Sequence, residues 1–399
     1  MRESCDILIS GGGIAGLTAA AAFGAAGFRV ICVDPAPPVT ERDAAGSDLR
    51  TTAFLQPARA LLERCGLWAR LVPHAAPLQV MRIVDAGGAS ASEPRLVRAF
   101  DAADISDQPF GWNLPNWLLR REILDRLEAL ETVDFRPGTA TTGLVTRTGA
   151  ARVALSDGSG VEARLVIAAD GRDSPMRTAA GIGVHTTRYG QKALAFAVTH
   201  PIAHDNVSTE IHRSGGPFTL VPLPDFKGRP SSAVVWMERG RAALDLLRMD
   251  PRDFEAAMTE RSCGLLGPLT LASRRTLWPI ITQHAERLAG ERLALMAEAA
   301  HVVPPIGAQG LNMSLADLRT LLDLVEARPE GLGDAAMLEA YHRARIGDIR
   351  LRVQGIDLLN RASMVSARPL RDARALGLNA LYALAPVRRM LMQMGLGVR

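Results

Sequence analysis

The residues with the clearest chemical meaning in this sequence are the glycines close to its N-terminus. They form a G-x-G-x-x-G pattern within GGGIAG at residues 11–16. A glycine-rich turn that leads into a helix offers free backbone N–H groups, at the positive end of the helix dipole, to phosphate oxygens. The pattern therefore predicts a phosphate-binding turn that consists of Gly11, Gly13, Ile14, Ala15 and Gly16.

The elements that position this turn can be predicted on both sides of it. Residues 6–10 form an apolar strand, residues 17–26 a helix of small residues, and residues 28–33 a second strand that closes at Asp34. Asp34 follows Gly16 by 18 residues, close to the spacing of ~20 at which a carboxylate binds a ribose hydroxyl. The unit predicts dinucleotide binding. The motif alone does not separate FAD from NAD, and a glycine-rich turn in another α/β protein is the alternative.

Two later segments have a similar organisation. Residues 163–171 form a strand that runs into Asp170-Gly171. Residues 292–297 form a strand with Glu298 at its end, and small residues and His301 follow. A stiff turn with Pro304, Pro305 and Gly307 follows, and a helix begins near Gln309. An acid at a strand end, a proline turn and a free helix N-terminus can hold a ribityl hydroxyl and the electron-rich edge of a flavin.

These blocks resemble those of the class A flavin-dependent aromatic hydroxylases, and most closely the UbiH-type branch that hydroxylates ubiquinone precursors. The matching blocks are GGGIAG at 11–16, DLRTTAF at 48–54, ADGRDSPMR at 169–177 and AEAAHVVPPIGAQGLNMSLAD at 297–317. The C-terminal stretches YHRARIGDIR and DLLNRAS extend the resemblance over essentially the whole chain. It implies an FAD-dependent monooxygenase that uses NAD(P)H and O2 on an electron-rich aromatic ring.

The resemblance also implies site residues. Arg50 lies near the flavin, and Arg120, or Arg121 if the register shifts by one, opens the helix before the third Rossmann strand. Asp170 and Gly171 contact both FAD and the pyridine nucleotide, with Arg177 behind them. Glu298 binds the ribityl chain. Pro305 lies beside the flavin, and the remaining contacts fall on Gly307, Gln309, Gly310, Leu311 and Asn312.

The chain departs from the family pattern at three places. Ala297-Glu298 stands where the family usually has Gly-Asp, and Gly307-Ala308-Gln309-Gly310 where it usually has Ala-Gly-Gln-Gly. Ser314 replaces a glycine. FAD binding remains the expectation, but these changes bear on the geometry of the flavin.

The predicted fold class is α/β, with a Rossmann-like FAD-binding domain, an inserted antiparallel β-sheet and a C-terminal helical tail. Residues 190–240 alternate apolar and polar side chains, as in a sheet with two different faces. The expected cofactor domain comprises residues 1–78, 101–182 and 275–332, the substrate-binding sheet 79–100 and 183–274, and the helical region 333–399. Pocket residues are expected to include Phe196, Thr219, Val221 and Trp236, for each of which ordinary core packing is at least as good an account.

His301 is a candidate catalytic base, because histidine is the common general base near neutral pH. The alternative is that it positions the proline turn. The other histidines and the four cysteines show no metal-ligand spacing, so no metal is expected. The cysteine pattern is that of a reduced, cytoplasmic protein.

Charge excludes one class of partner and leaves another open. The net charge is +4, no Lys/Arg run resembles a nucleic-acid patch and aromatic residues make up 5%, which argues against nucleic-acid binding. Residues 361–399 carry seven arginines and one acid, Asp372. This tail either lies on an anionic membrane surface, as a polyprenylated substrate would favour, or packs on the Rossmann domain. Oligomeric state cannot be read from the sequence.

The alternatives to a hydroxylase are a flavoprotein reductase of the isoprenoid-chain type and a catalytically weak flavoprotein that acts as a partner in a biosynthetic complex. Ala297-Glu298 is the only sequence feature that favours the latter.

Overall fold

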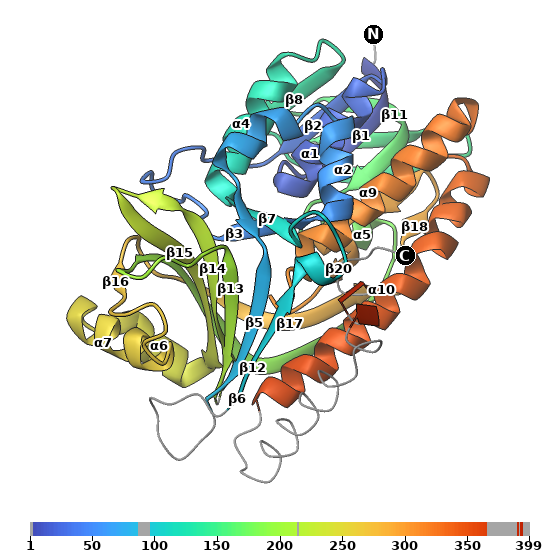
Figure 1. The fold of residues 1–399 in the computed structure, drawn as a ribbon. Coiled ribbons are helices and arrows are strands. Elements are labelled where there is room, and N and C mark those ends of the chain that lie inside the picture. Colours follow the sequence, from blue (N-terminus) through green and yellow to red (C-terminus); the bar gives the residue numbers. More distant parts are fainter. Residues whose placement is uncertain (1–2, 87–95, 214, 365–388, 391, 394–399) are drawn as a thin grey trace.

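The computed structural model describes residues 3–86, 96–213, 215–364, 389–390 and 392–393. Two large sheets, joined by a small third sheet, organise this part of the chain (Figure 1). The predicted class, a Rossmann-like α/β domain with an antiparallel sheet and a C-terminal helix, is confirmed.

The first sheet is built on parallel strands in the order β19-β11-β1-β2-β8. Three further strands extend it: β18 pairs with β19, and β10 and β9 continue antiparallel from β11. The bounds are β1 Glu3–Ser10, β2 Val30–Asp34, β8 Val133–Pro137, β9 Thr141–Thr146, β10 Ala151–Leu155, β11 Gly160–Ala168, β18 Ala289–Gly290 and β19 Leu293–Leu295.

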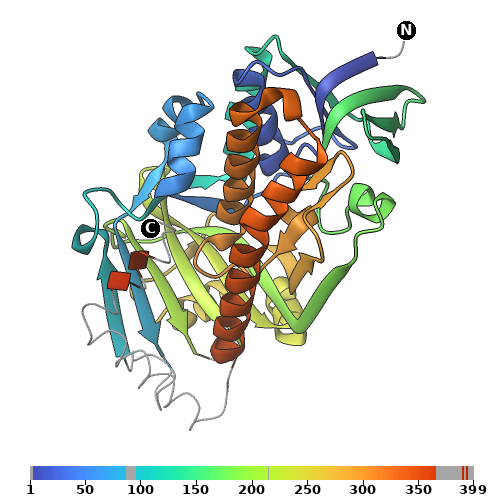
Figure 2. The same ribbon diagram turned by 90° about the vertical axis from the view of Figure 1, so that its right-hand side faces the viewer.

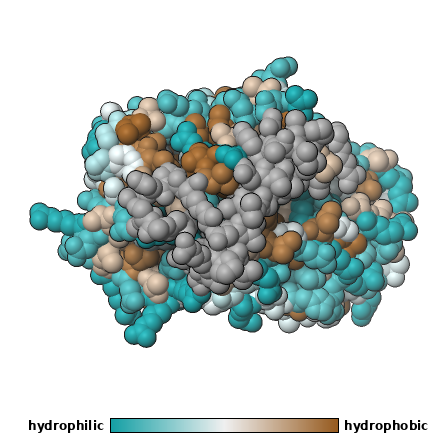
Figure 3. Space-filling view, turned by 60° about the horizontal axis from the view of Figure 1, so that its bottom comes forward, coloured by the Kyte–Doolittle hydropathy of each residue, from teal (hydrophilic) through white to brown (hydrophobic). Residues whose placement is uncertain are grey.

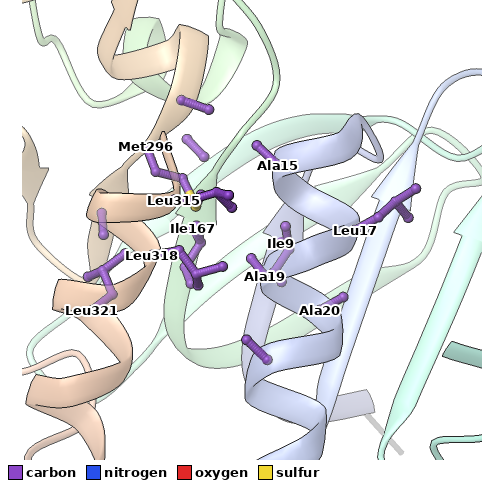
Figure 4. Packing of buried hydrophobic residues seen from close by; sticks show 14 of the residues in the cluster. Ile9, Ala15, Leu17, Ala19, Ala20, Ile167, Met296, Leu315, Leu318 and Leu321 are labelled. Carbon is purple, nitrogen blue, oxygen red and sulfur yellow. The ribbon is translucent and has the colours of Figure 1, made fainter. Parts of the chain in front are cut away.

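Helices cover this sheet and bury its apolar strands. Helix α1 (Ile14–Ala25) contacts α4 (Asn116–Glu128) and α9 (Gln309–Ala327) as well as the sheet. Since α1 is buried on nearly every side, it consists mainly of alanine and glycine and has no polar face. Figure 4 shows Ala15 and Ala19 of α1 on the side where Ile167, Leu315 and Leu318 gather. This packing fixes the N-termini of α1 and α9 at the same edge of the sheet.

The second sheet is mostly antiparallel and runs β20-β17-β12-β15-β14-β13-β5-β6, with β16 paired to β12. Its bounds are β5 Val80–Asp85, β6 Leu96–Asp101, β12 Val184–Thr199, β13 Val207–His212, β14 Pro217–Phe226, β15 Arg229–Arg239, β16 Thr270–Leu271, β17 Thr276–Ala285 and β20 His301–Val302. Strands β17 and β20 belong here although the sequence assigns residues 275–332 to the cofactor domain. The chain leaves this sheet for β18 and β19, and β20 returns to it.

The two faces of the second sheet differ in side-chain size. One face carries aromatic rings that pack on α7 (Pro251–Arg261), where Phe254 lies 5.1 Å from Phe196 and 5.9 Å from Trp236 between ring centroids. Phe196 and Trp236 are therefore core residues, and the interpretation of them as pocket residues is wrong. Alternation places Thr219 and Val221 on the opposite face, together with the alanines of β12.

The third sheet, β3-β7-β4, lies between the two large ones (Figure 1). Its strands are β3 Thr51–Leu55, β4 Ala76–Leu78 and β7 Gly111–Pro115. Helices α2 (Gln56–Arg64) and α3 (Trp68–Leu71) lie between β3 and β4 in the chain. Three other short helices are α5 Pro175–Ala179, α6 Gly240–Arg248 and α8 Ala297–Ala300.

The long helix α10 (Ala335–Met364) runs beside α9 and continues down past the second sheet (Figure 2). It accounts for the first half of the helical region predicted at 333–399. Most of the arginine-rich tail lies outside the described residues. In the described part of the chain, no helix is long and apolar enough to cross a membrane.

Candidate functional site

The glycine turn lies between the end of β1 and the start of α1. Gly11 has a φ of +109° and donates its N–H to Val33 O at 2.8 Å, which closes the turn against β2. Gly13 is the N-cap of α1, and the helix has neither a side-chain cap nor an acidic residue in its first turn. The free N–H groups at Ile14, Ala15 and Gly16 therefore face a ligand without competition from the protein.

The three motif glycines have different tasks. A Cβ on Gly11 would lie 2.4 Å from Ala169 O, and one on Gly16 would lie 1.9 Å from Gly11 O. Both glycines are required for backbone packing. A Cβ on Gly13 would meet no protein atom within 4 Å, and Gly13 has an ordinary φ of −70°. The open space at Gly13 is what a pyrophosphate needs in order to approach the backbone.

Asp34 ends β2 beside this turn. Its carboxylate accepts the N–H of Gly12 at 2.6 Å and the N–H of Ala36 at 2.9 Å. These two bonds fix the carboxylate at the mouth of the glycine turn, where a ribose hydroxyl can donate to its remaining lone pairs.

A buried carboxylate holds the two candidate arginines. Asp48 accepts two bonds from Arg50, at 2.8 and 2.7 Å, and one from the Asn116 amide at 3.0 Å. Arg120 lies 3.8 Å away, and its Nε is buried without a partner. Burial alone raises the pKa of Asp48, but Arg50, Asn116 and Arg120 outweigh it and lower that pKa to about 2. Arg121 pairs with Glu122 instead, so the geometry supports Arg120.

Arg50 also links the cofactor side to the second sheet. Its guanidinium lies 4.2 Å from the ring centroid of Trp278 on β17. Burial lowers the pKa of Arg50, but the Asp48 pair and the charge of Glu298 raise it overall. Arg50 and Glu298 therefore lie within electrostatic reach of one another.

Asp170 follows β11 at the other side of the glycine turn. One carboxylate oxygen accepts the Met176 N–H at 3.1 Å, and the other, Oδ1, is buried without a partner. Burial raises the pKa of this group. A buried acceptor without a donor is costly, and a ligand hydroxyl would satisfy it. Gly171, at a φ of +88°, turns the chain away at this point.

The sequence predicts Glu298 at the end of a strand, but the structure does not place it there. Strand β19 stops at Leu295, and Ala297 has a φ of +54°, which turns the chain into the four-residue helix α8. The family pattern has glycine at this position, and the left-handed conformation explains why. The Glu298 side chain is 49% exposed, and its nearest cation is Arg172 at 3.8 Å. It is free to accept a bond from a ligand.

The turn after β20 presents exposed backbone. Pro305, Gly307 and Gly310 are exposed, whereas Ile306 between them is buried and anchors the turn. Ala308, the N-cap of α9, has a φ of +56° and provides no side-chain cap. The first turn of α9, with Gln309, Gly310, Leu311 and Asn312, thus offers free N–H groups at a positive helix end. An electron-rich flavin edge is a suitable acceptor for them.

Asn312 has a role that the sequence does not show. Its amide accepts the N–H of Leu55 at 2.9 Å and donates to Ala53 O at 2.7 Å and Ala308 O at 2.6 Å. The side chain therefore joins α9 to β3, and only its backbone is available to a flavin.

His301 is not placed for direct chemistry. Its ring is almost fully buried, and Nε2 lies 2.6 Å from Asp317 Oδ2. Asp317 also accepts a bond from Arg345 at 2.8 Å. The geometry fits the alternative, in which His301 positions the proline turn. No group of His, Cys, Asp and Glu residues in the described ranges could hold a metal ion.

The comparisons with known proteins agree with this arrangement. The model of the FAD-binding-domain family matches residues 4–351. The chain is 34% identical to the ubiquinone hydroxylase UbiL of Rhodospirillum rubrum over 395 residues, 98% of this chain and 89% of that protein. It is 28% identical to the 3-demethoxyubiquinol 3-hydroxylase of Escherichia coli over 401 residues, with full coverage of both.

The chain belongs to this family of FAD-dependent hydroxylases. The flavoprotein also shares its fold with p-nitrophenol 4-monooxygenase PnpA of Pseudomonas putida, with a TM-score of 0.81, 19% identity and full coverage of both chains. The open space at Gly13, the unpaired Asp170 oxygen and the free helix N-termini fit the pyrophosphate, ribityl chain and ring of FAD. The protein is thus an FAD-dependent monooxygenase.

Sequence reasoning missed several residues of this FAD site. Asp48 lies two residues before Arg50, within the quoted block DLRTTAF, so its spacing was a usable signal. Trp278 and Asn116 carried no such signal, because each meets Arg50 or Asp48 from a distant segment.

Proposed function

We propose that this monooxygenase hydroxylates the aromatic ring of a ubiquinone precursor, with NAD(P)H as reductant and O2 as the source of the hydroxyl oxygen. The observation that supports this substrate class most is the end-to-end similarity to two proteins named as hydroxylases of ubiquinone or its precursor. When bound, FAD supplies the redox chemistry that activates O2.

The residues of this chain bind and orient the cofactor and the substrate. The glycine turn and Asp34 hold the adenosine and pyrophosphate, Asp170 and Glu298 accept ribityl hydroxyls, and the first turn of α9 donates to the flavin edge. The small side chains on the face of the second sheet opposite α7, including Thr219 and Val221, line the side from which water is kept from the reacting ring. This division of labour explains why no catalytic dyad or triad stands out.

An oxygen-consumption assay tests the proposal. The purified flavoprotein is given NADH or NADPH with a series of prenylated and unprenylated phenols, and products are identified by mass spectrometry with labelled O2. Hydroxylated product that carries the label is the expected result. Oxidation of the reductant with saturation of a prenyl chain and no O2 uptake would support the reductase. Stable FAD binding without turnover of any phenol would support the partner role.

A second proposal concerns the membrane. We infer that the lower end of the molecule rests on an anionic bilayer. Two large apolar side chains near the C-terminal end of α10, Leu358 and Leu359, are 69% and 57% exposed. Figure 3 shows apolar patches among polar residues on this lower face. The arginine excess of residues 361–399 supplies attraction to anionic headgroups.

Liposome sedimentation distinguishes this from simple packing of the tail. Removal of residues 386–399, or the double change L358Q/L359Q, should each reduce binding to anionic liposomes while FAD stays bound. Unchanged binding in both variants would reject membrane contact. Loss of FAD or solubility in the truncated protein would show that the tail is structural.

A further inference from the structure

A continuous chain of polar contacts joins α10 to β20 and to the first residue of α9, the two elements that flank the turn between them. It begins in the interior, where Asp317 of α9 contacts His301 at 2.6 Å and Arg345 at 2.8 Å. Asp317 is fully buried, and His301 and Arg345 are nearly so. His301 is the first residue of β20, the strand that leads into the turn, so Arg345 is linked to this strand through one shared carboxylate.

The same contacts continue along α10 to the end of the turn. Arg345 Nη1 donates to Asp348 at 2.7 Å, and Arg352 Nε donates to the other oxygen of Asp348 at 3.0 Å. Arg352 Nη1 then donates to Gln309 Oε1 at 2.6 Å. The Gln309 amide in turn donates to Gly307 O at 2.9 Å, within the turn itself.

The turn needs such support, because its backbone is unfavourable for its sequence. Ala308, at the end of the turn, has a φ of +56°, and Ala297, which begins α8 before β20, has a φ of +54°. A non-glycine residue in the left-handed region costs roughly 1–2 kcal/mol, and such conformations persist only where surrounding contacts hold them. The contact from Arg352 to Gln309 lies next to Ala308, and the contact from Asp317 to His301 lies between Ala297 and the turn.

Part of the network is open to solvent. Gln309, Asn312, Arg345, Asp348 and Arg352 line a cavity of about 450 Å³ between α2, α9 and α10. Removal of the Arg352 guanidinium therefore enlarges an existing cavity and leaves no sealed void. Arg345, in contrast, neutralises the buried Asp317, and its replacement is expected to unfold the protein.

We propose that α10 sets the position of the flavin-edge turn, with Arg352 and Arg345 as positioning residues that act through Gln309 and Asp317. This rests on the proposed placement of the flavin edge at the first turn of α9, but not on the identity of the hydroxylated ring. Its consequence is that a helix which contributes no cofactor ligand governs how tightly FAD binds and how readily it is reduced.

The variant R352M tests the proposal, with R361M as the matched control. Arg361 also forms an i, i+4 pair on α10, with Asp357 at 2.8 Å, but it makes no contact with the turn. Titration of FAD into the apoproteins should show roughly tenfold weaker binding for R352M. The affinity of R361M should equal that of the parent within error. The positive end of α9 stabilises reduced flavin more than oxidised flavin. R352M should therefore also lower the midpoint potential of bound FAD by about 30 mV, which corresponds to a tenfold change in the two-electron reduction equilibrium.

A double-mutant cycle with Q309A completes the test. If Arg352 acts through Gln309, the double variant R352M/Q309A should bind FAD no more weakly than the worse of the two single variants. The proposal is overturned if R352M binds FAD with the parent's affinity and potential, or if the two changes add independently. A drop in thermal stability of R352M without a change in affinity or potential would show a merely structural ion pair and would also overturn it. None of these measurements requires turnover, so failure of the proposed function would leave their outcome unaffected.

Discussion

The phosphate-binding turn and the flavin-edge turn serve the same cofactor but are held in different ways. The first is closed by neighbouring strands: Gly11 bonds to Val33, and Gly12 bonds to Asp34. The second depends on remote segments, since Asn312 bonds to β3 and Gln309 bonds to Arg352 of α10. A local turn is specified by glycines, whereas a turn held from a distance tolerates alanine at positive φ because other elements bear the strain.

The largest effect is expected at the phosphate-binding turn. Gly13→Val should yield a folded protein without FAD, because the added side chain fills only the space that the pyrophosphate requires. The purified variant should lack flavin absorption, and its unfolding midpoint should equal that of the parent apoprotein.

Gly16→Ala provides the contrast. Its Cβ would collide with Gly11 O at 1.9 Å, so the apoprotein itself should lose stability. A Gly13→Val protein that retains a full complement of flavin would show that this turn does not hold the pyrophosphate.

Asn312→Ala should instead damage the flavin-edge turn through the fold. The change leaves the Leu55 N–H and the carbonyls of Ala53 and Ala308 without their partner. An unsatisfied buried group costs about 1–3 kcal/mol, and water will replace part of the loss. We expect urea unfolding of the apoprotein to show a loss of about 3 kcal/mol.

Thr320→Ala is the control for that measurement, because the Thr320 hydroxyl returns to Ala316 O of its own helix. It should change stability by less than about 0.5 kcal/mol. Equal stabilities for the Asn312 variant and the parent would contradict a structural role for this amide.

The same contrast explains what could be predicted from sequence. The glycine turn, β1, α1 and Asp34 form one contiguous unit, so spacing alone located them. The strand predicted at 292–297 ends already at Leu295, and the alanine at 297 gives no sign of the positive φ that turns the chain into α8. Alternation identified the second sheet but not which face meets the cofactor, so Phe196 and Trp236 were assigned to the wrong face. The contacts of Arg345 and Arg352 exist only once α10 lies beside α9.

Glu298 tests whether the flavin-edge region binds the ribityl chain. A charge-assisted hydrogen bond contributes about 1.5–3 kcal/mol, so Glu298→Ala should weaken FAD binding by roughly one to two powers of ten. Glu298→Asp keeps the carboxylate and should be much milder. Titration of FAD into both apoproteins decides this. Parental affinity in both would mean that a neighbouring group holds the ribityl chain.

The effect of Asp48→Asn on stability is expected to depend on pH. The contacts with Arg50, Asn116 and Arg120 lower the pKa of the folded Asp48 carboxyl to about 2, compared with ~3.9 in an unfolded chain. A carboxyl whose pKa is lower in the folded state stabilises the protein above its unfolded pKa and loses that contribution as the pH falls toward the folded value. The free energy of unfolding of the parent should therefore exceed that of the variant by about 2.6 kcal/mol at pH 7 and by about 1.3 kcal/mol at pH 3.

Urea unfolding of the apoproteins at several pH values between 3 and 7 measures this difference. Asp323→Asn is the control, since Asp323 forms an exposed pair with Arg64, and such pairs contribute about 0–1 kcal/mol. If Asp48 holds both arginines for FAD, its variant should also bind FAD more weakly at pH 7, whereas the control should not. A stability difference that stays constant from pH 7 to pH 3 would mean that the Asp48 charge does not hold these arginines, and that the region between the two turns is fixed by packing alone.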